Sequence, residues 1–233
     1  MRNLKQNETL DHSMHHSYES NSLKDFLKRI PFLFNLAKLV YIFLLHLNSR
    51  RRWIKLLQSK EVKLNLGSGP TRGKNGWVNV DLFGADINHD LTKGVPLKDN
   101  TVDAVYSSHV FEHIPYKDLI HVISEIRRIL KPGGKLLVCV PNAGLYLRAY
   151  FKNEMFVSYD EMYIPAAVNT NSKIDQLNYI AYLNGDHTFM FDEENIINIL
   201  KMCDFNSVDF REFNPDIDQK ERDFESMYVQ AYK

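Results

Sequence analysis

The 233-residue sequence is poor in cysteine and has no net charge, and both features narrow the classes of protein to which it can belong. Its two cysteines, Cys139 in an apolar run and Cys203 near a predicted helix end, indicate no disulfide framework and no zinc-ligand spacing. The 29 basic residues equal the 29 acidic residues, so no overall charge attracts the chain to nucleic acid. Hydrophobic residues make up 44%, enough for one substantial core. We therefore expect a cytoplasmic protein that does not bind nucleic acid.

The chain also lacks a phosphate-binding turn that opens a long helix. A dinucleotide fingerprint needs G-x-G-x-x-G, with an acidic residue about 20 positions further on. Residues 63–81 give G-x-G-x-x-x-G instead, and Asp81 follows Gly69 by only 12 positions (81 minus 69). A proline and two glycines interrupt any helix between the two predicted strands. Without a helix dipole a pyrophosphate is held poorly, so a cofactor with a ribose and no phosphate fits better.

The same segment offers a site for a nucleoside. Gly67 and Gly69 allow the backbone to approach a ligand where a Cβ would collide, and Asp81 can accept the hydroxyl protons of a ribose. The alternative is that the glycines form a plain turn and that Asp81 caps a helix. The agreement of this segment with others further along the chain favours the cofactor.

Three later segments follow in a recognisable order. They are Asp90-Leu91, the strand 102–106 followed by Ser107-Ser108-His109, and Lys131-Pro132-Gly133-Gly134. Together with the glycine turn they resemble the class I S-adenosylmethionine-dependent methyltransferases, in particular the methyltransferase type 11 group. The resemblance covers residues 61–142 closely and 187–233 loosely. It implies a Rossmann-like, seven-stranded methyltransferase sheet with helices on both faces over residues 61–233, and S-adenosyl-L-methionine as the cofactor.

The resemblance also implies which residues bind the cofactor. The glycine turn would line its methionine end, the carboxylate closing the second strand its ribose, the segment near residue 90 its adenine, and the residues after strand 102–106 its sulfonium. These cofactor-binding residues are Asn65, Gly67, Ser68, Gly69, Asp81, Leu82, Asp90, Leu91, Ser107, Ser108 and His109. Asn65 stands near a position where many relatives carry an acidic residue, which weakens the expected grip on the cofactor's amino group.

Periodicity and turn residues predict the remaining layout. Strands are expected near 62–66, 77–81, 85–88, 102–107, 135–141, 206–213 and 226–232, and helices over 117–130 and 192–203. The Lys-Pro-Gly-Gly segment is interpreted as a stop between helix and strand, because proline cannot continue a helix and glycine allows the sharp return.

His109, Glu112 and His113 match the inverted zinc-protease pattern H-x-x-E-H. That motif needs a stable helix and a further ligand, whereas here it follows a strand and meets Pro115 within a turn. We expect no metal at this motif, and expect Glu112 and His113 to position the turn instead.

An apolar stretch and an excess of basic residues precede the predicted domain. Residues 24–60 contain nine lysines and arginines against one aspartate, a net charge of plus eight (nine minus one), and 30–47 are almost wholly apolar. This predicted helix has three places for its apolar sides: the domain or a homodimer interface, a membrane surface contacted through 30–52, or the bilayer interior. Lys38 disfavours the last of these. Residues 1–23 are interpreted as a mobile polar tail, and no secretory signal is recognised.

Residues 143–186 are too long for a simple connection and are rich in tyrosine and phenylalanine. They are interpreted as a lid over the methyl donor that governs substrate choice, with a small satellite core as the open alternative. After them, His187 is the candidate general base, oriented by Asp186, and a purely structural histidine is the alternative.

The expected function is transfer of a methyl group from S-adenosylmethionine to an oxygen or nitrogen of a small acceptor. The resemblance suggests a sugar in polysaccharide or glycolipid assembly, and the basic helix suggests peripheral placement at the inner face of a membrane. A non-catalytic, cofactor-binding adaptor recruited through that helix is the alternative. Nicotinamide-dependent oxidoreduction would need the phosphate turn that is missing.

Overall fold

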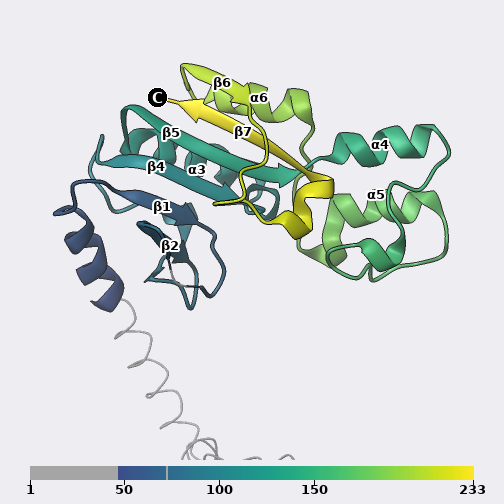
Figure 1. Cartoon of the computed structure of the whole chain (residues 1–233), viewed down its shortest axis with the longest axis horizontal. Coiled ribbons are helices and arrows are strands. Elements are labelled where there is room, and N and C mark those ends of the chain that lie inside the picture. The colour runs from purple at the N-terminus through teal and green to yellow at the C-terminus, as the bar shows by residue number, and fades with distance from the viewer. Residues whose placement is uncertain (1–46, 72) are drawn as a thin grey trace, which may run out of the picture. The chain divides into compact units, whose positions relative to one another are not determined.

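The computed structural model describes residues 47–71 and 73–233, which form a single mixed β-sheet with helices and an inserted helical subregion (Figure 1). The predicted tail 1–23, most of the basic extension and the apolar stretch 30–46 lie outside the described residues. Residues 47–56 are helical. Of the residues described, none belongs to a helix with both the length and the apolar character needed to cross a bilayer.

The sheet has seven strands in the order β3-β2-β1-β4-β5-β7-β6. The strands are β1 (Lys63–Leu66), β2 (Trp77–Asp81), β3 (Ile87–Asn88), β4 (Val102–Ser108), β5 (Leu130–Pro141), β6 (Ser207–Phe210) and β7 (Ser226–Tyr232). The first five pair in parallel, and β7 is antiparallel to both β5 and β6. The chain starts at β1, adds β2 and β3 on one side of it, and then adds β4 and the later strands on the other side. This is the doubly wound arrangement. The predicted Rossmann-like methyltransferase sheet is confirmed.

Two details differ from the sequence-based expectation. The third strand is only two residues long. The fifth begins at Leu130, because Leu130 already pairs with Val102 and a register shift then absorbs the glycines. The expected stop between helix and strand is therefore a bulge within one strand, at which Gly133 takes a left-handed φ of 76°.

Helices α3 (Tyr116–Ile129) and α6 (Glu193–Met202) form close to where periodicity placed them. The Asp192 side chain accepts the Asn195 amide at 2.7 Å and so caps α6, as its sequence indicates. The first crossover, from β1 to β2, contains no helix among its described residues. The glycine turn is therefore a loop, as predicted.

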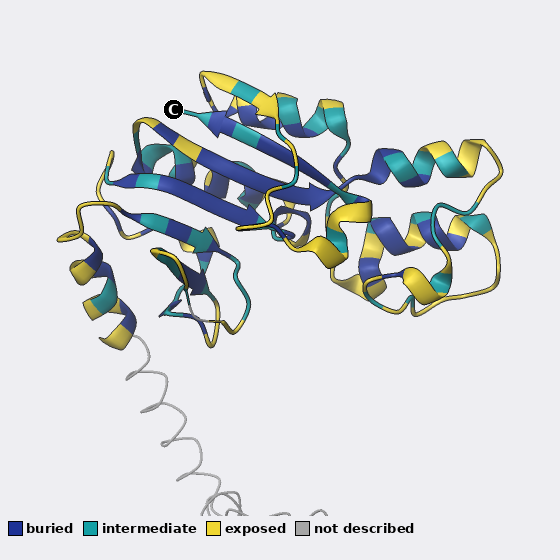
Figure 2. Cartoon of the chain, viewed as in Figure 1, coloured by how far each residue is buried: buried dark blue, intermediate teal, exposed yellow. Residues whose placement is uncertain are grey.

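The two faces of the sheet differ in composition. Alternate residues of a strand point to opposite faces of the sheet, and we say that residues on the face of Leu64 have the parity of Leu64. These residues pack in one large apolar cluster with α3, α6 and the helical residues 47–56. Residues with the parity of Asn65 include Asn79 and Tyr106, and the segment 211–225 crosses them. Within the described residues, α3, α6 and the helical residues 47–56 contribute to the apolar cluster, and the segment that crosses the second face includes the 3₁₀ helix η5 (Lys220–Glu225). Figure 2 shows the central strands almost wholly buried.

The predicted lid forms its own small helical subregion beyond the carboxyl ends of β4 and β5 (Figure 1). It contains α4 (Ala143–Phe151), the 3₁₀ helix η3 (Tyr159–Glu161), α5 (Lys173–Tyr182) and the 3₁₀ helix η4 (Leu183–Gly185). Buried Tyr146 and Tyr179 centre a separate cluster, which is the satellite core left open by the sequence. Its two ends meet, because the Ala143 amide donates to the Phe191 carbonyl at 2.8 Å.

Candidate active site

The glycine turn after β1 has the backbone conformation that its sequence predicts. Gly67 and Gly69 have left-handed φ angles of 73° and 67°. A Cβ at Gly67 would lie 2.1 Å from Val110 Cγ2, so no larger residue fits there. The Gly69 amide donates to Asp81 Oδ2 at 2.8 Å. The turn and the carboxylate that closes β2 are thus held against each other.

A cavity of about 240 Å³ opens beside this turn, and we call it the first cavity. It is lined by Gly67, Asp81, Leu82, His89, Asp90, Leu91, Thr92, Val110, His113, Ile114 and Pro115. Five of these residues were expected to bind the cofactor. Sequence reasoning missed the contribution of residues 110–115, although they follow directly after the carboxyl end of β4, where ligands bind in open α/β sheets.

The lining of the first cavity fits a nucleoside. Most of it is apolar and suits the faces of a base, while Asp81 provides acceptors for ribose hydroxyls. Asp90 accepts from the Thr92 amide and hydroxyl at 3.1 and 2.7 Å, which fixes the 3₁₀ helix η1 (Leu91–Lys93). Those bonds from Thr92 also hold the pKa of the Asp90 carboxyl below its usual value. The Asp90 side chain therefore shapes the backbone that lines the cavity.

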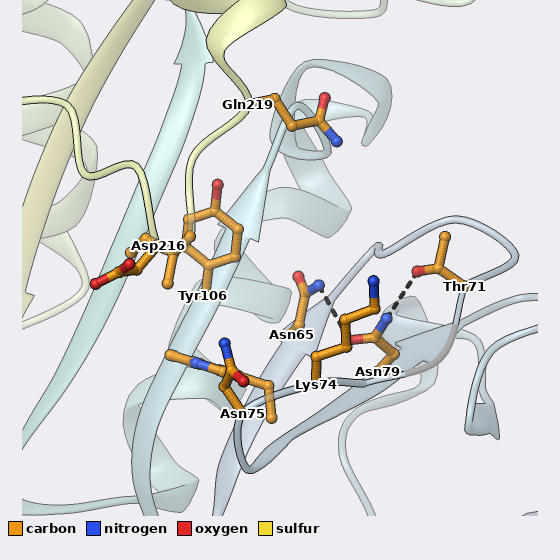
Figure 3. A pocket seen from close by; sticks show the side chains of 10 residues that line it. Asn65, Thr71, Lys74, Asn75, Asn79, Tyr106, Asp216 and Gln219 are labelled. Carbon is orange, nitrogen blue, oxygen red and sulfur yellow. Dashed lines mark hydrogen bonds between the residues drawn. The ribbon is translucent and has the colours of Figure 1, made fainter.

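Asn65 lies on the other face of the sheet and lines a second cavity of about 390 Å³, drawn in Figure 3. Its amide donates to Asn79 Oδ1 at 3.1 Å, Asn79 donates to Thr71 Oγ1 at 2.7 Å, and Thr71 donates to the Ser68 carbonyl at 3.1 Å. This chain of hydrogen bonds ties the strand to the glycine turn (Figure 3). In the structure, Asn65 positions the turn and is not among the residues that line the first cavity.

Ser107 and Ser108 end β4 and His109 follows it, but none of the three lines the first cavity. Ser107 Oγ donates to the Leu66 carbonyl at 3.2 Å. His109 has a left-handed φ of 54° and places its Nε2 2.9 Å from Ser226 Oγ. Both side chains are buried; Ser107 joins β4 to the neighbouring β1, and His109 contacts the first residue of β7. Burial lowers the pKa of His109, although Glu112 opposes this shift.

The motif after β4 and the histidine after the lid come together in space. The 3₁₀ helix η2 (Phe111–His113) buries Phe111, as expected, and exposes only 1% of Glu112. The Glu112 carbonyl accepts the Thr188 amide at 2.8 Å. The rings of His113 and His187 stand edge to face, with centroids 4.9 Å apart. Glu112, His113 and His187 each offer one side-chain oxygen or nitrogen that could bind a metal ion, and these three atoms lie within 4.8 Å of one another.

The hydrogen bond that orients His187 differs from the predicted one. Its Nδ1 lies 2.8 Å from the Ile180 carbonyl. Asp186 takes part through its own carbonyl, which lies 3.0 Å from His113 Nδ1. The predicted orienting role of the Asp186 side chain is therefore performed by a backbone group of α5, which sequence spacing does not reveal. Burial lowers the pKa of His187 and favours its neutral form.

The fold and the first cavity define the class of Rossmann-like proteins that bind a nucleoside at the carboxyl ends of parallel strands. Within that class, residues 65–138 match the family model described as "Methyltransferase domain". This match confirms the resemblance to class I methyltransferases of the type 11 group over residues 65–138.

Two curated proteins match part of the chain at moderate identity. An uncharacterized protein of Methanocaldococcus jannaschii is 38% identical over 74 residues, covering 32% of this chain and 30% of that protein. A "probable S-adenosylmethionine-dependent methyltransferase" of Mycolicibacterium smegmatis is 42% identical over 57 residues, 24% of this chain and 21% of that protein. The chain thus matches less than a third of the length of these curated relatives.

Among solved structures, a SAM-dependent methyltransferase from Archaeoglobus fulgidus superposes with a TM-score of 0.47 and 16% identity. The superposition covers 80% of this chain and 93% of that chain.

Proposed function

We propose that the protein transfers a methyl group from S-adenosylmethionine to an oxygen or nitrogen of a small acceptor. One observation carries the proposal: Gly67, Asp81 and Asp90-Leu91 converge on one cavity inside the segment that matches a methyltransferase domain. The bound cofactor supplies a methyl group on a positively charged sulfur. The protein needs to hold this donor, align the acceptor with it and exclude water.

The residues of the first cavity suit this task. Asp81 would accept the ribose hydroxyls, because it is already fixed by the Gly69 amide. The backbone at Asp90-Leu91 and the apolar side chains of Leu82 and Ile114 would enclose the base. Gly67 would place bare backbone beside the methionine end. Ser107, Ser108 and His109 would support this end from behind.

We propose a sugar in polysaccharide or glycolipid assembly as the acceptor. The lid presents exposed aromatic rings, with Tyr150 39% and Tyr182 61% exposed, and such rings pack on the apolar faces of sugars. The basic extension supports placement at the inner face of a membrane through residues 30–52, where lipid-linked sugars are found, because its net charge of plus eight is attracted to anionic headgroups. A homodimer formed through the same stretch is the alternative use of it.

The acceptor must lose a proton when an O-methyl bond forms. His187 carries its proton on Nδ1, toward the Ile180 carbonyl, so its Nε2 is the free base of the ring. His113 lines the first cavity and stands between His187 and the proposed position of the donor. We therefore propose that proton removal takes place at the His113 and His187 rings beside Glu112.

Calorimetry with S-adenosylhomocysteine tests the proposal. The full chain should bind it, and Asp81→Ala should weaken binding by roughly 10- to 100-fold, since two hydrogen bonds to a carboxylate are lost. Glu221→Gln, which removes an exposed charge elsewhere, is the matched control. Equal binding by wild type and Asp81→Ala would contradict the site. A labelled methyl donor with cell-envelope glycans, compared with peptide and nucleic-acid extracts, then tests the acceptor class.

A further inference from the structure

The cluster of Glu112, His113 and His187 is closed on one side and open on the other. Glu112 and His187 are 1% and 6% exposed. The His113 side chain is 37% exposed and lines the first cavity. A ligand held by all three side chains would therefore be screened from the protein surface yet reachable from the cavity.

Backbone carbonyls determine which nitrogen of each ring carries the proton. His113 Nδ1 donates to the Asp186 carbonyl at 3.0 Å, and His187 Nδ1 donates to the Ile180 carbonyl at 2.8 Å. A carbonyl can only accept, so in both neutral rings the Nε2 atom is unprotonated. Histidines that ligate metals are oriented by this kind of bond to the second nitrogen. Both rings thus present a lone pair on Nε2.

The groups that meet in the cluster are acceptors. Within the part of the chain that the structure describes, both carboxylate oxygens of Glu112 and Nε2 of His187 have no hydrogen-bond partner. His113 Nε2 lies 3.8 Å from Glu112 Oε1, too far for a hydrogen bond. A buried carboxylate left in this state is costly. A cation placed among these atoms would remove that cost.

His109 adds a fourth acceptor. The Ser226 hydroxyl donates to the Arg222 carbonyl at 2.6 Å, so its oxygen accepts from His109 Nε2 at 2.9 Å. In the neutral ring, Nδ1 then carries the lone pair and lies 3.3 Å from Glu112 Oε1. In this arrangement a proton added to the His109 ring would compensate the carboxylate, and so would a metal ion.

We propose that Glu112, His113 and His187 bind a divalent transition-metal ion, with Zn²⁺ as the first candidate. Two imidazoles and one carboxylate are a ligand set that binds Zn²⁺ and leaves one position open. Zinc–ligand distances of about 2.0–2.2 Å in tetrahedral geometry place ligand atoms roughly 3.3 Å apart. The observed limit of 4.8 Å therefore requires a contraction of the cluster on binding.

This ligand set differs from the inverted zinc-protease pattern. In the protease pattern both histidines of the motif bind the metal from one helix, but here η2 has only three residues. The second histidine ligand comes from position 187, beyond the lid. Sequence spacing alone gives no indication of it, which is why the sequence led us to expect no metal.

The role of the ion rests on the proposed methyl transfer. Because His113 lines the first cavity, an ion held by these three side chains would be reachable from it and could bind an acceptor hydroxyl, lowering the pKa of that hydroxyl. The acceptor oxygen forms the new bond to the methyl carbon, the sulfur–carbon bond breaks with its electron pair going to sulfur, and the hydroxyl proton passes to water. With the ion bound, the His113 and His187 rings would take part in proton removal as ligands of the ion that activates the hydroxyl; without it, they would remove the proton directly, as proposed above.

Metal titration of the full chain tests the site without any substrate. After removal of metals with a chelator and dialysis, Zn²⁺ is titrated by calorimetry and Co²⁺ by visible absorption. We expect a single ion per chain. His113→Asn should weaken Zn²⁺ binding by at least roughly 100-fold, since losing even an outer-shell partner costs 10- to 100-fold. His121→Asn, an exposed histidine of α3, should leave binding unchanged.

Glu112→Gln provides a second variant, with circular dichroism confirming the fold of each variant. Equal Zn²⁺ binding by wild type, His113→Asn and Glu112→Gln would overturn the site. Loss of that binding when His12, His15 and His16 are replaced with asparagine would then locate it in the N-terminal segment. No Zn²⁺ binding by wild type would show that the cluster holds a proton instead. S-adenosylhomocysteine binding in the same samples separates the two proposals, because loss of zinc alone leaves the methyl-transfer proposal standing.

Discussion

The two faces of the sheet are stabilised by different interactions. On the face with the parity of Leu64, aliphatic side chains pack against helices and are almost fully buried. On the face with the parity of Asn65, amides, a tyrosine and the buried Arg211–Asp218 ion pair take their place. The stability that the apolar face provides depends on how completely its side chains fill the space between sheet and helices. The hydrogen bonds of the polar face instead hold loops at defined positions on the strands. The glycine turn of the first cavity belongs to this second kind of structure.

The largest effect is expected on the polar face, from Asp218→Ala. The carboxylate is fully buried and accepts from Arg211 at 2.6 and 2.7 Å, and also from Tyr106. Removing it leaves a nearly buried guanidinium unpaired, so we expect a loss of about 3–5 kcal/mol in the free energy of unfolding. Urea denaturation measures this loss. The exposed Glu212→Ala removes the same charge and should change little; equal losses in both variants would contradict the assignment.

A smaller effect is expected on the apolar face, from Ile126→Ala in α3. Ile126 is 0% exposed in the large cluster, and its truncation leaves a cavity. The expected loss is about 3 kcal/mol by urea denaturation. Met202 on α6 is 68% exposed, and Met202→Ala is the control. If Ile126→Ala cost no more than this control, the apolar face would not be close-packed.

Asn79→Ala tests whether the polar face shapes the glycine turn. The substitution breaks the hydrogen bonds from Asn65 to Asn79 and from Asn79 to Thr71. We expect a loss of about 1–2 kcal/mol in stability and a few-fold weaker binding of S-adenosylhomocysteine. Thermal unfolding and calorimetry measure the two effects. Weaker stability with unchanged binding would show that the chain of hydrogen bonds does not reach the site.

An effect on stability as small as that of Asn79→Ala, but dependent on pH, is expected from Glu125→Gln in α3. Hydrogen bonds from Arg128 at 2.7 and 2.9 Å hold the pKa of the Glu125 carboxyl below its ordinary value. A carboxyl with a lowered folded-state pKa stabilises the protein above its unfolded pKa of about 4.3, and this stabilisation is lost as pH falls through the lower, folded pKa. Wild type should therefore exceed Glu125→Gln by about 1–2 kcal/mol at pH 7, and the difference should shrink below about pH 4. A difference that does not vary with pH would refute this explanation.

Much of the fold was predictable because local patterns determined it. Alternation identified β1, β2, β4 and β7, and the interrupting proline and glycines predicted a first crossover without a helix. The start of β5 was not predictable, since the Lys-Pro-Gly-Gly segment reads as a turn and becomes a bulge only through pairing with Val102. Pairing between distant strands is not encoded in local spacing.

The candidate site divides in the same way. Gly67, Asp81 and Asp90 were identifiable because each follows a strand and therefore lies at one edge of the sheet. The partnership of His113 with His187 was not, since it depends on how the lid returns to the sheet. The role of Asn65 was also hidden, because its side chain belongs to the opposite face.

The meeting of the two ends of the lid subregion has a consequence for how such proteins diversify. Asn142 pairs with Phe191 and the Ala143 amide donates to the Phe191 carbonyl, so the insertion leaves and re-enters the sheet at one point. Its length and sequence are thereby uncoupled from the strands, because closing a longer loop between fixed ends adds little entropy cost. An insertion of another shape could therefore replace this one without altering how the strands of the sheet pair.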